Sequence, residues 1–253
     1  MSRLHNKIAI VTGAGGGIGR AICRAFCREG AAVIAIDINA DTVSATVEEI
    51  VGEEGQDGRC VAFVGDVADE ETAIGGVRLA QEKFGAPNVL VNNAVFDLPF
   101  APLTDISLPD WQRTLDVNLT SAFLMSKHVI PPMAGDGGGS IIHVASQLGG
   151  VARPGRPWYC AAKGGLVSLA QAMAVDHAHQ KIRVNSLSPG PVETGRYVKN
   201  FDSVEAARAS NYTLYERLGE PDEIANGAVF LASNESSFMT GADLLIDGGY
   251  CAV

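Results

Sequence analysis

A tyrosine and a lysine four residues apart have the types and the spacing that proton transfer requires. Tyr159 and Lys163 lie in a segment with helical character, so both side chains project from one face. A lysine ammonium close to a phenol favours the phenolate and so lowers the pKa of the phenol. Lowering that pKa from about 10 to near 7 requires roughly 4 kcal/mol of differential stabilisation. Taken alone, the pair is more typical of a solvated helix face, and its interpretation depends on the motifs around it.

A glycine-rich turn near the N-terminus is the second motif. The sequence TGAGGGIG, from Thr12 to Gly19, follows an apolar run and opens a helical segment. Glycines let the backbone turn tightly against a pyrophosphate, whose charge is stabilised by free amides and by the helix dipole. Such turns also arise for steric reasons, but the order of strand, turn and helix is the one that dinucleotide binding requires. We therefore predict dinucleotide contacts from Gly13, Gly17, Ile18 and Gly19.

An aspartate at the end of the second apolar run bears on the identity of the dinucleotide. Asp37 stands 18 residues past Gly19. A carboxylate there accepts hydrogen bonds from the adenosine ribose and repels the 2'-phosphate that distinguishes NADP from NAD. The alternative is an aspartate that only caps the following turn. Because Ile36, Ile38 and Asn39 beside it include no arginine, the sequence favours NAD over NADP.

The elements that position these residues follow a regular alternation. Seven short apolar runs, predicted as strands, span residues 8–11, 32–36, 60–64, 89–91, 140–144, 182–187 and 244–246. Longer amphipathic segments, predicted as helices, span residues 18–28, 41–53, 70–84, 108–133, 158–179 and 221–232. This alternation implies right-handed βαβ crossovers and a parallel sheet covered on both faces. We predict a single α/β domain over residues 1–253, with a doubly wound, seven-stranded parallel sheet of the Rossmann-like type.

The interval from Glu193 to Leu218 departs from this regularity. It separates the sixth strand from the last helix and carries four aromatic residues, namely Tyr197, Phe201, Tyr212 and Tyr215. A connection of that length in a compact α/β domain usually has a function, often as a cover of the active site. We predict that residues 193–218 form a lid over the substrate.

Composition and charge argue against several classes of partner. The 253 residues carry a formal net charge of -10, which opposes attraction to nucleic acid phosphates. The first apolar run meets a glycine too soon for a signal peptide or a membrane span. The five cysteines form no CxxC pair and no cluster at zinc-ligand spacing. We expect no nucleic acid or membrane partner, no metal site and a cytoplasmic location.

The chain resembles the short, single-domain members of the short-chain dehydrogenase/reductase family. The resemblance runs from Thr12 to the C-terminal DGGY and therefore covers nearly the whole chain. The motifs that carry it are the glycine turn, Asp37, Asp66-Val67, Asn92-Asn93-Ala94, Asn118, Ser146, Tyr159, Lys163 and the run from Pro189 to Thr194. Together they are specific for fold and cofactor class but say little about the substrate.

The resemblance implies a role for each catalytic residue. Tyr159 is expected to act as general base in oxidation and as general acid in reduction, exchanging the proton with the substrate oxygen. Ser146, 13 residues upstream, is expected to hydrogen-bond the same oxygen. Lys163 is expected to bind the nicotinamide ribose and to lower the pKa of the phenol. Asn118 is expected to hold a water that links Lys163 to solvent, although an asparagine there also fits the bending or capping of a helix.

The resemblance also implies the remaining cofactor contacts and an assembly. Further contacts to the cofactor are expected from Ile38, Asp66, Val67, Asn93, Ala94, Tyr159, Lys163, Pro189, Gly190, Val192 and Thr194. The family implies a homotetramer. One departure stands out, because Val95 replaces the glycine that usually follows Asn92-Asn93-Ala94, and a β-branched side chain there crowds the nicotinamide ribose or reshapes the pocket.

The sequence leaves the substrate broadly defined. Substrate contacts are predicted from Ser146, Gln147, Phe96, Arg153, Arg156, Trp158 and Tyr197. Arginines near the predicted mouth leave an anionic substrate open, although exposed arginines are ordinary. We expect an NAD-dependent enzyme that transfers hydride between the nicotinamide and a small polar, cyclic or sugar-like secondary alcohol or ketone. The alternative is an NAD-binding regulatory or scaffold protein with little turnover, whereas a nucleotide-sugar epimerase normally needs a larger substrate domain.

Overall fold

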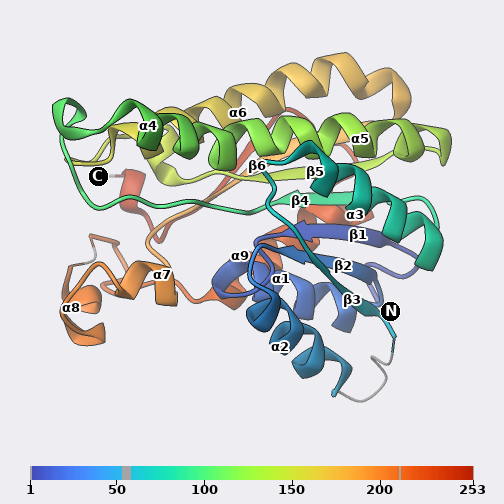
Figure 1. The fold of residues 1–253 in the computed structure, drawn as a ribbon, viewed down its shortest axis with the longest axis horizontal. Coiled ribbons are helices and arrows are strands. Elements are labelled where there is room, and N and C mark those ends of the chain that lie inside the picture. The colour runs from blue at the N-terminus through green and yellow to red at the C-terminus, as the bar shows by residue number, and fades with distance from the viewer. Residues whose placement is uncertain (1, 53–57, 211, 253) are drawn as a thin grey trace.

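The computed structural model describes residues 2–52, 58–210 and 212–252, and its centre is one parallel sheet. The sheet has seven strands in the order β3-β2-β1-β4-β5-β6-β7 (Figure 1). The strands are β1 (Ile8–Thr12), β2 (Ala32–Asp37), β3 (Cys60–Val64), β4 (Val89–Asn92), β5 (Gly139–Val144), β6 (Ile182–Pro189) and β7 (Asp243–Ile246). The predicted doubly wound sheet is therefore confirmed.

Helices cover both faces of the sheet, which explains why most of the strands are continuous apolar runs. They are α1 (Gly17–Arg28), α2 (Ala40–Val51), α3 (Glu70–Lys83), α4 (Leu108–Leu115), α5 (Ser121–Gly135), α6 (Pro157–His177), α7 (Gly195–Val198), α8 (Val204–Ala209) and α9 (Pro221–Ala232). One apolar core lies between the sheet and α1, α2 and α9, and a second lies between the sheet and α3, α5 and α6. Figure 1 shows α4, α5 and α6 together on one side of the sheet, and α7 and α8 projecting beyond its edge.

Two predicted segments differ from the observed structure. The helix expected over residues 108–133 is interrupted by a π turn at Asp116–Thr120, which separates α4 from α5. The predicted lid is not an open loop, because α7 and α8 lie within it and the residues that flank it, Val192 and Gly219, form an isolated parallel bridge. Residue 53, where the second predicted helix ends, lies outside the described residues; α2 ends at Val51.

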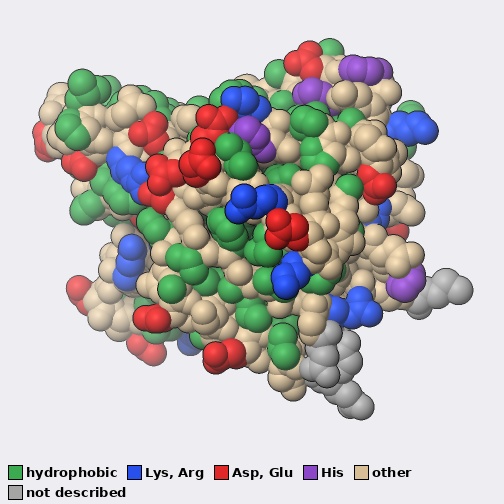
Figure 2. Space-filling model, turned by 45° about the vertical axis from the view of Figure 1, so that its right-hand side comes forward, with side chains coloured by type: hydrophobic (Ala, Val, Ile, Leu, Met, Phe, Trp, Pro, Cys, Tyr) green, Lys and Arg blue, Asp and Glu red, His purple; other side chains and the backbone are tan. Residues whose placement is uncertain are grey.

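None of the helices in the described part of the chain is long and apolar enough to cross a bilayer. Figure 2 shows acidic and basic side chains interspersed on one face of the molecule.

The glycine turn between β1 and α1 requires glycine at two positions for different reasons. Gly13 has a φ of 64°, in the left-handed region that side chains disfavour. A Cβ on Gly19 would lie 2.0 Å from the carbonyl oxygen of Gly13, so the first turn of α1 can approach the strand end only without a side chain. Gly16, in contrast, is extended, and a Cβ there would meet no atom within 4 Å.

Replacing Gly19 with alanine therefore tests the close approach. Alanine favours a helix by about 1 kcal/mol over glycine, but overpacking of this kind costs about 1–3 kcal/mol or more. We expect Gly19→Ala to lower the melting temperature by several degrees in calorimetry, at roughly 2–4 °C per kcal/mol for a chain of this size. The matched variant Gly16→Ala is expected to melt as the wild type does; equal melting of both variants would contradict the model of the turn.

Candidate active site

A cavity opens at the carboxyl ends of the strands, where β1 and β4 lead their chains to opposite faces of the sheet. Its volume is about 380 Å³. It is lined by predicted cofactor residues, namely Gly13, Gly17, Ile18, Asp37, Asn93, Pro189, Gly190, Val192 and Thr194. Three of the four predicted catalytic residues, Ser146, Tyr159 and Lys163, line it as well. The fold thus brings two distant motifs, the glycine turn and the tyrosine-lysine pair, to one site.

A set of hydrogen bonds fastens the ends of β1 and β4 beside the glycine turn. The Thr12 hydroxyl accepts from the backbone N–H groups of Asn93 at 2.9 Å and Ala94 at 3.1 Å. The Asn93 amide donates to the carbonyls of Thr12 at 2.9 Å and Gly13 at 3.1 Å. The side chain of Asn93 therefore holds the turn in place.

Asp37 is anchored where β2 ends. One carboxylate oxygen accepts from the backbone N–H of Gly15 at 2.8 Å, and the other accepts from that of Asn39 at 3.0 Å. These bonds fix the carboxylate at the wall of the cavity next to the glycine turn. A rigid negative charge in this position is what the predicted preference for NAD requires.

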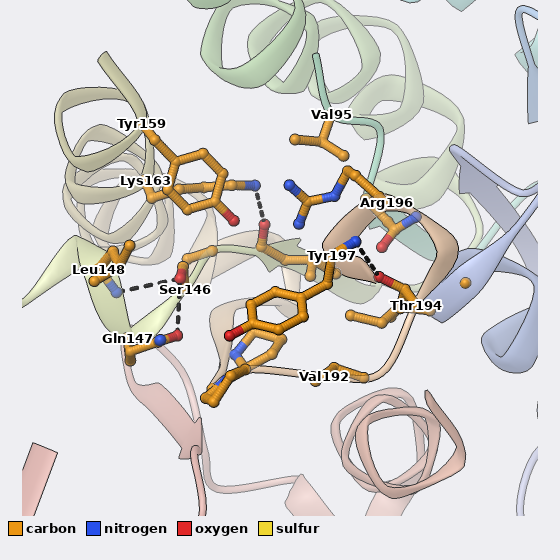
Figure 3. Close-up of a pocket in the computed structure, with 18 of the residues that line it drawn as sticks. Val95, Ser146, Gln147, Leu148, Tyr159, Lys163, Val192, Thr194, Arg196 and Tyr197 are labelled. Carbon is orange, nitrogen blue, oxygen red and sulfur yellow. Dashed lines mark hydrogen bonds between the residues drawn. The ribbon is translucent and has the colours of Figure 1, made fainter. Parts of the chain in front are cut away.

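The proton-transfer residues come from the end of β5 and the first turns of α6. Ser146 donates to the side-chain oxygen of Gln147 at 3.0 Å and accepts from the backbone N–H of Leu148 at 3.2 Å. The ammonium of Lys163 donates to the carbonyl of Val144 at 2.6 Å and lies 5.7 Å from the ring centre of Tyr159. Figure 3 shows the hydroxyl groups of Ser146 and Tyr159 facing the same space.

Two cations lower the pKa of the Tyr159 phenol. Burial by itself would raise that pKa, but the positive charges of Arg196 and Lys163 outweigh it, and hydrogen bonds from Ser146 and Arg196 add to the lowering. Burial also lowers the pKa of Lys163, against the attraction of Tyr159. The sequence anticipated the lysine but not the arginine, which reaches the phenol from α7.

Arg196 and Arg156 share one buried carboxylate. Asp97 follows β4, and its side chain is only 4% exposed. One of its oxygens accepts from the guanidinium of Arg156, and the other accepts from that of Arg196 at 3.1 Å. Arg156 is further packed with its guanidinium carbon 3.9 Å from the ring centre of Phe100. Asp97 was missed because an isolated aspartate in a loop carries no motif; its position shortly after a strand that ends at the cavity was the available signal.

Asn118 lies in the π turn and does not line the cavity. Its side-chain oxygen accepts from the backbone N–H of Phe96 at 2.8 Å, and its amide donates to the carbonyl of Phe96 at 2.9 Å. The π turn widens the helix at this point, as is common at functional sites. Asn118 therefore fixes the loop after β4, and the water that it was expected to hold stays a prediction.

The predicted substrate residues divide into two groups. Gln147, Arg153, Arg156 and Tyr197 line the cavity with Ser146. Trp158 does not, because it is fully buried and packs edge-on against Tyr159 at 5.4 Å between ring centres. Phe96 does not either, since it packs on the core beneath α3 and α5, with the guanidinium of Arg113 over its ring. Val95, Leu148, Ser210, Tyr212 and Tyr250 also line the cavity, and of these the sequence singled out neither Ser210 nor Tyr250.

Several predicted cofactor residues lie outside the cavity. Gly19 is buried beneath the turn, and Ala94 packs on the core. Ile38 is 62% exposed, and Val67 is buried in the core. Asp66 accepts from Arg113 at 2.5 Å and from the backbone N–H of Ala68 at 3.0 Å. Contacts from these residues to a dinucleotide remain predictions.

The described residues show no candidate metal centre. Within them, no group of three His, Cys, Asp or Glu side chains converges as a metal site would require. All five cysteines are free thiols, of which Cys23, Cys27 and Cys60 are buried.

Comparisons with known proteins agree with this geometry. A family model described as enoyl-(acyl carrier protein) reductase matches residues 13–251. The D-threitol dehydrogenase of Mycolicibacterium smegmatis is 38% identical, over 98% of this chain and 94% of that protein. The cis-4-hydroxycyclohexanecarboxylate dehydrogenase of Sinomonas cyclohexanicum is 36% identical, over 98% of this chain and 97% of that protein. A crystal structure of a short-chain dehydrogenase/reductase from Burkholderia xenovorans superposes with a TM-score of 0.91 at 34% identity, covering 100% of this chain and 99% of that one.

The electrostatic arrangement predicts how Tyr159 titrates. Replacing Arg196 with glutamine removes a cation beside the phenol, so less stabilisation of the phenolate remains and the pKa of Tyr159 rises. The titration is measured by NMR of protein labelled at tyrosine Cζ, with Tyr159→Phe identifying the resonance. Arg208→Gln, which changes an exposed arginine of the same lid paired with Glu193, is the matched control and is expected to leave the pKa unchanged. An unchanged titration in Arg196→Gln would contradict the assigned cause.

Proposed function

The chain belongs to the short-chain dehydrogenase/reductase family, and on that premise we propose that it is an NAD-dependent enzyme interconverting a secondary alcohol and its ketone. That it is an oxidoreductase of alcohol substrates follows from its relatives. The finer proposal is that the substrate is small and polar, cyclic or sugar-like. The dehydrogenase proposal rests on one observation, which is that Ser146, Tyr159 and Lys163 line the same cavity as the glycine turn.

The residues at the turn fit a dinucleotide. Gly13, Gly16 and Gly17 of the turn line the cavity, and a Cβ on Gly16 would meet no atom within 4 Å, which leaves room for a pyrophosphate against the backbone. Asp37 would bind the adenosine ribose, and Lys163 the nicotinamide ribose. Val192 and Thr194 line the same cavity, and Thr194 lies beside Gly17 of the turn. When bound, the nicotinamide supplies the carbon that accepts or donates the hydride.

The chain's own residues handle the proton. In oxidation, the phenolate of Tyr159 accepts the hydroxyl proton of the substrate, and in reduction the phenol returns it. Ser146 turns its hydroxyl from Gln147 to the substrate oxygen and stabilises the charge that develops there. Lys163 and Arg196 favour the phenolate, so oxidation proceeds at a lower pH than an ordinary tyrosine would allow. We propose that Asn118 supports the proton path by fixing the loop at Phe96.

The proposal also covers the lid over the substrate, the oligomeric state and the cellular location. Residues 193–218 cover the substrate, since Arg196, Tyr197, Ser210 and Tyr212 all face the cavity. The family resemblance supports a homotetramer in the cytoplasm, and light scattering over a concentration series distinguishes it from a monomer.

Cofactor preference is tested at Asp37. We expect the wild type to favour NAD over NADP in kcat/KM, because the carboxylate repels the 2'-phosphate. Asp37→Ser is expected to shrink that preference by roughly tenfold or more, equivalent to about 1.4 kcal/mol. Asp41→Ser, at an exposed aspartate of α2, is the control that keeps the wild-type preference. Equal use of NADP by the wild type would overturn the assignment.

The role of Tyr159 is tested by removing its hydroxyl. Tyr159→Phe is expected to lower kcat/KM by on the order of 100-fold or more, because general acid-base catalysis of this size is lost. NADH binding, followed by fluorescence, is expected to persist. Full activity in the variant would refute the mechanism. Intact NADH binding by the wild type without turnover of any alcohol or ketone in a broad panel would instead favour a regulatory NAD-binding protein.

A further inference from the structure

The substrate end of the cavity carries an excess of positive charge. Four cationic side chains line the cavity, namely Arg153, Arg156, Lys163 and Arg196. Among the described residues that line it, the one acid is Asp37, which lies at the glycine turn. Asp97 lies behind the arginines and is itself almost fully buried.

Two of these cations, Lys163 and Arg156, are each paired with an anionic group of the protein. The phenolate of Tyr159 offsets the charge of Lys163 during proton transfer. Arg156 is 9% exposed and is held between Asp97 and the ring of Phe100, which makes it a structural support of the site. Neither group needs an anion from the substrate.

Arg196 and Arg153 retain donors that face the cavity. Arg196 gives one N–H group to the second oxygen of Asp97, and its side chain remains 35% exposed. Its guanidinium carbon is 5.8 Å from the ring centre of Tyr159, close to where the reacting oxygen must lie (Figure 3). Arg153 has its guanidinium 5.4 Å from the ring centre of Phe100, and a ring face satisfies a cation only in part.

We propose that the alcohol substrate carries a carboxylate, which Arg196 binds with Arg153 at the edge of the cavity. The proposal rests on the proposed function and names the substrate class of the same site. A guanidinium presents its donors in a planar fork that matches a carboxylate. The group formed by Arg156, Asp97 and Arg196 has a net charge of +1, which a single carboxylate neutralises. Asp97 holds Arg196 in the cavity, and Arg156 holds Asp97.

Two other roles for Arg196 predict different results. If it only tunes Tyr159, its removal affects charged and neutral substrates alike. If Arg196 binds the dinucleotide, its removal weakens the binding of NADH. The experiment therefore compares ligands of equal shape and different charge.

The binding arm uses probes that cannot react. Cyclohexanecarboxylate and its isostere cyclohexanecarboxamide are titrated into the enzyme–NADH complex, and so are acetate and acetamide, with NADH fluorescence as the readout. We expect the wild type to bind at least one carboxylate tighter than its amide by roughly tenfold or more. Arg196→Gln is expected to weaken binding of that carboxylate by roughly 10- to 100-fold and to leave the affinities for the amide and for NADH unchanged. Arg208→Gln is the control, since this lid arginine pairs with Glu193 at the surface.

The turnover arm compares 4-hydroxycyclohexanecarboxylate with its methyl ester and with cyclohexanol. We expect the wild type to favour the acid in kcat/KM. Because Arg196→Gln also raises the pKa of Tyr159, we expect it to lower turnover of every substrate at a given pH, but to lower that of the acid by a larger factor and so to lose the preference. Failure of the wild type to distinguish carboxylate from amide in both probe pairs, or an equal loss for acid and ester in Arg196→Gln, overturns the proposal. Weakened NADH binding in Arg196→Gln overturns it in favour of a cofactor contact. If the enzyme turns over neutral alcohols but no carboxylate, the dehydrogenase assignment stands and the proposed carboxylate site is wrong. If Tyr159→Phe keeps full activity, the dehydrogenase mechanism is wrong, and the proposed carboxylate site is not affected.

Discussion

The site depends on how the ends of β1 and β4 are held against each other. Their chains leave toward opposite faces of the sheet, and a crevice opens between them. Thr12 and Asn93 span that crevice with side-chain hydrogen bonds to backbone groups on both sides. The glycine turn follows one strand end, and the loop to Asp97 follows the other. A single set of bonds therefore fixes the glycine turn relative to the loop that carries Asp97, the partner of Arg196.

Burial of charge is the second constraint. Tyr159 and Lys163 lie where desolvation disfavours ions, so the phenolate forms only because cations outweigh that penalty. Burial disfavours the charge of Arg196 as well, but Tyr159 and Asp97 outweigh that effect and raise its pKa further. The charged groups thus stabilise one another through a chain of contacts that runs from α6 through the lid to the loop after β4. Removing one member leaves another buried without a partner.

The sequence predicts the parts of this arrangement that depend on local order. Strands buried on both faces are continuous apolar runs, and the glycine turn is legible because strand, turn and helix are adjacent in the chain. The π turn at Asn118 was not predicted, and the hydrogen bonds that Asn118 makes there are with the backbone of Phe96, which is remote in sequence. The same reason hides the ion pairs of Asp97 with Arg156 and Arg196. Trp158 was misassigned because its neighbour Tyr159 faces the cavity while its own ring turns into the core.

The placement of Arg196 on α7 links the position of the lid to the protonation of the catalytic phenol. Tyr159 belongs to α6, so the distance between the two groups is set by how closely α7 lies against the strand ends. Coulomb attraction weakens with distance, and a lid that swings outward therefore increases the affinity of Tyr159 for its proton. By thermodynamic linkage, the protonation of Tyr159 in turn affects the position of the lid. Deprotonation of Tyr159 therefore strengthens the attraction that holds Arg196 of α7 beside α6, and protonation weakens it.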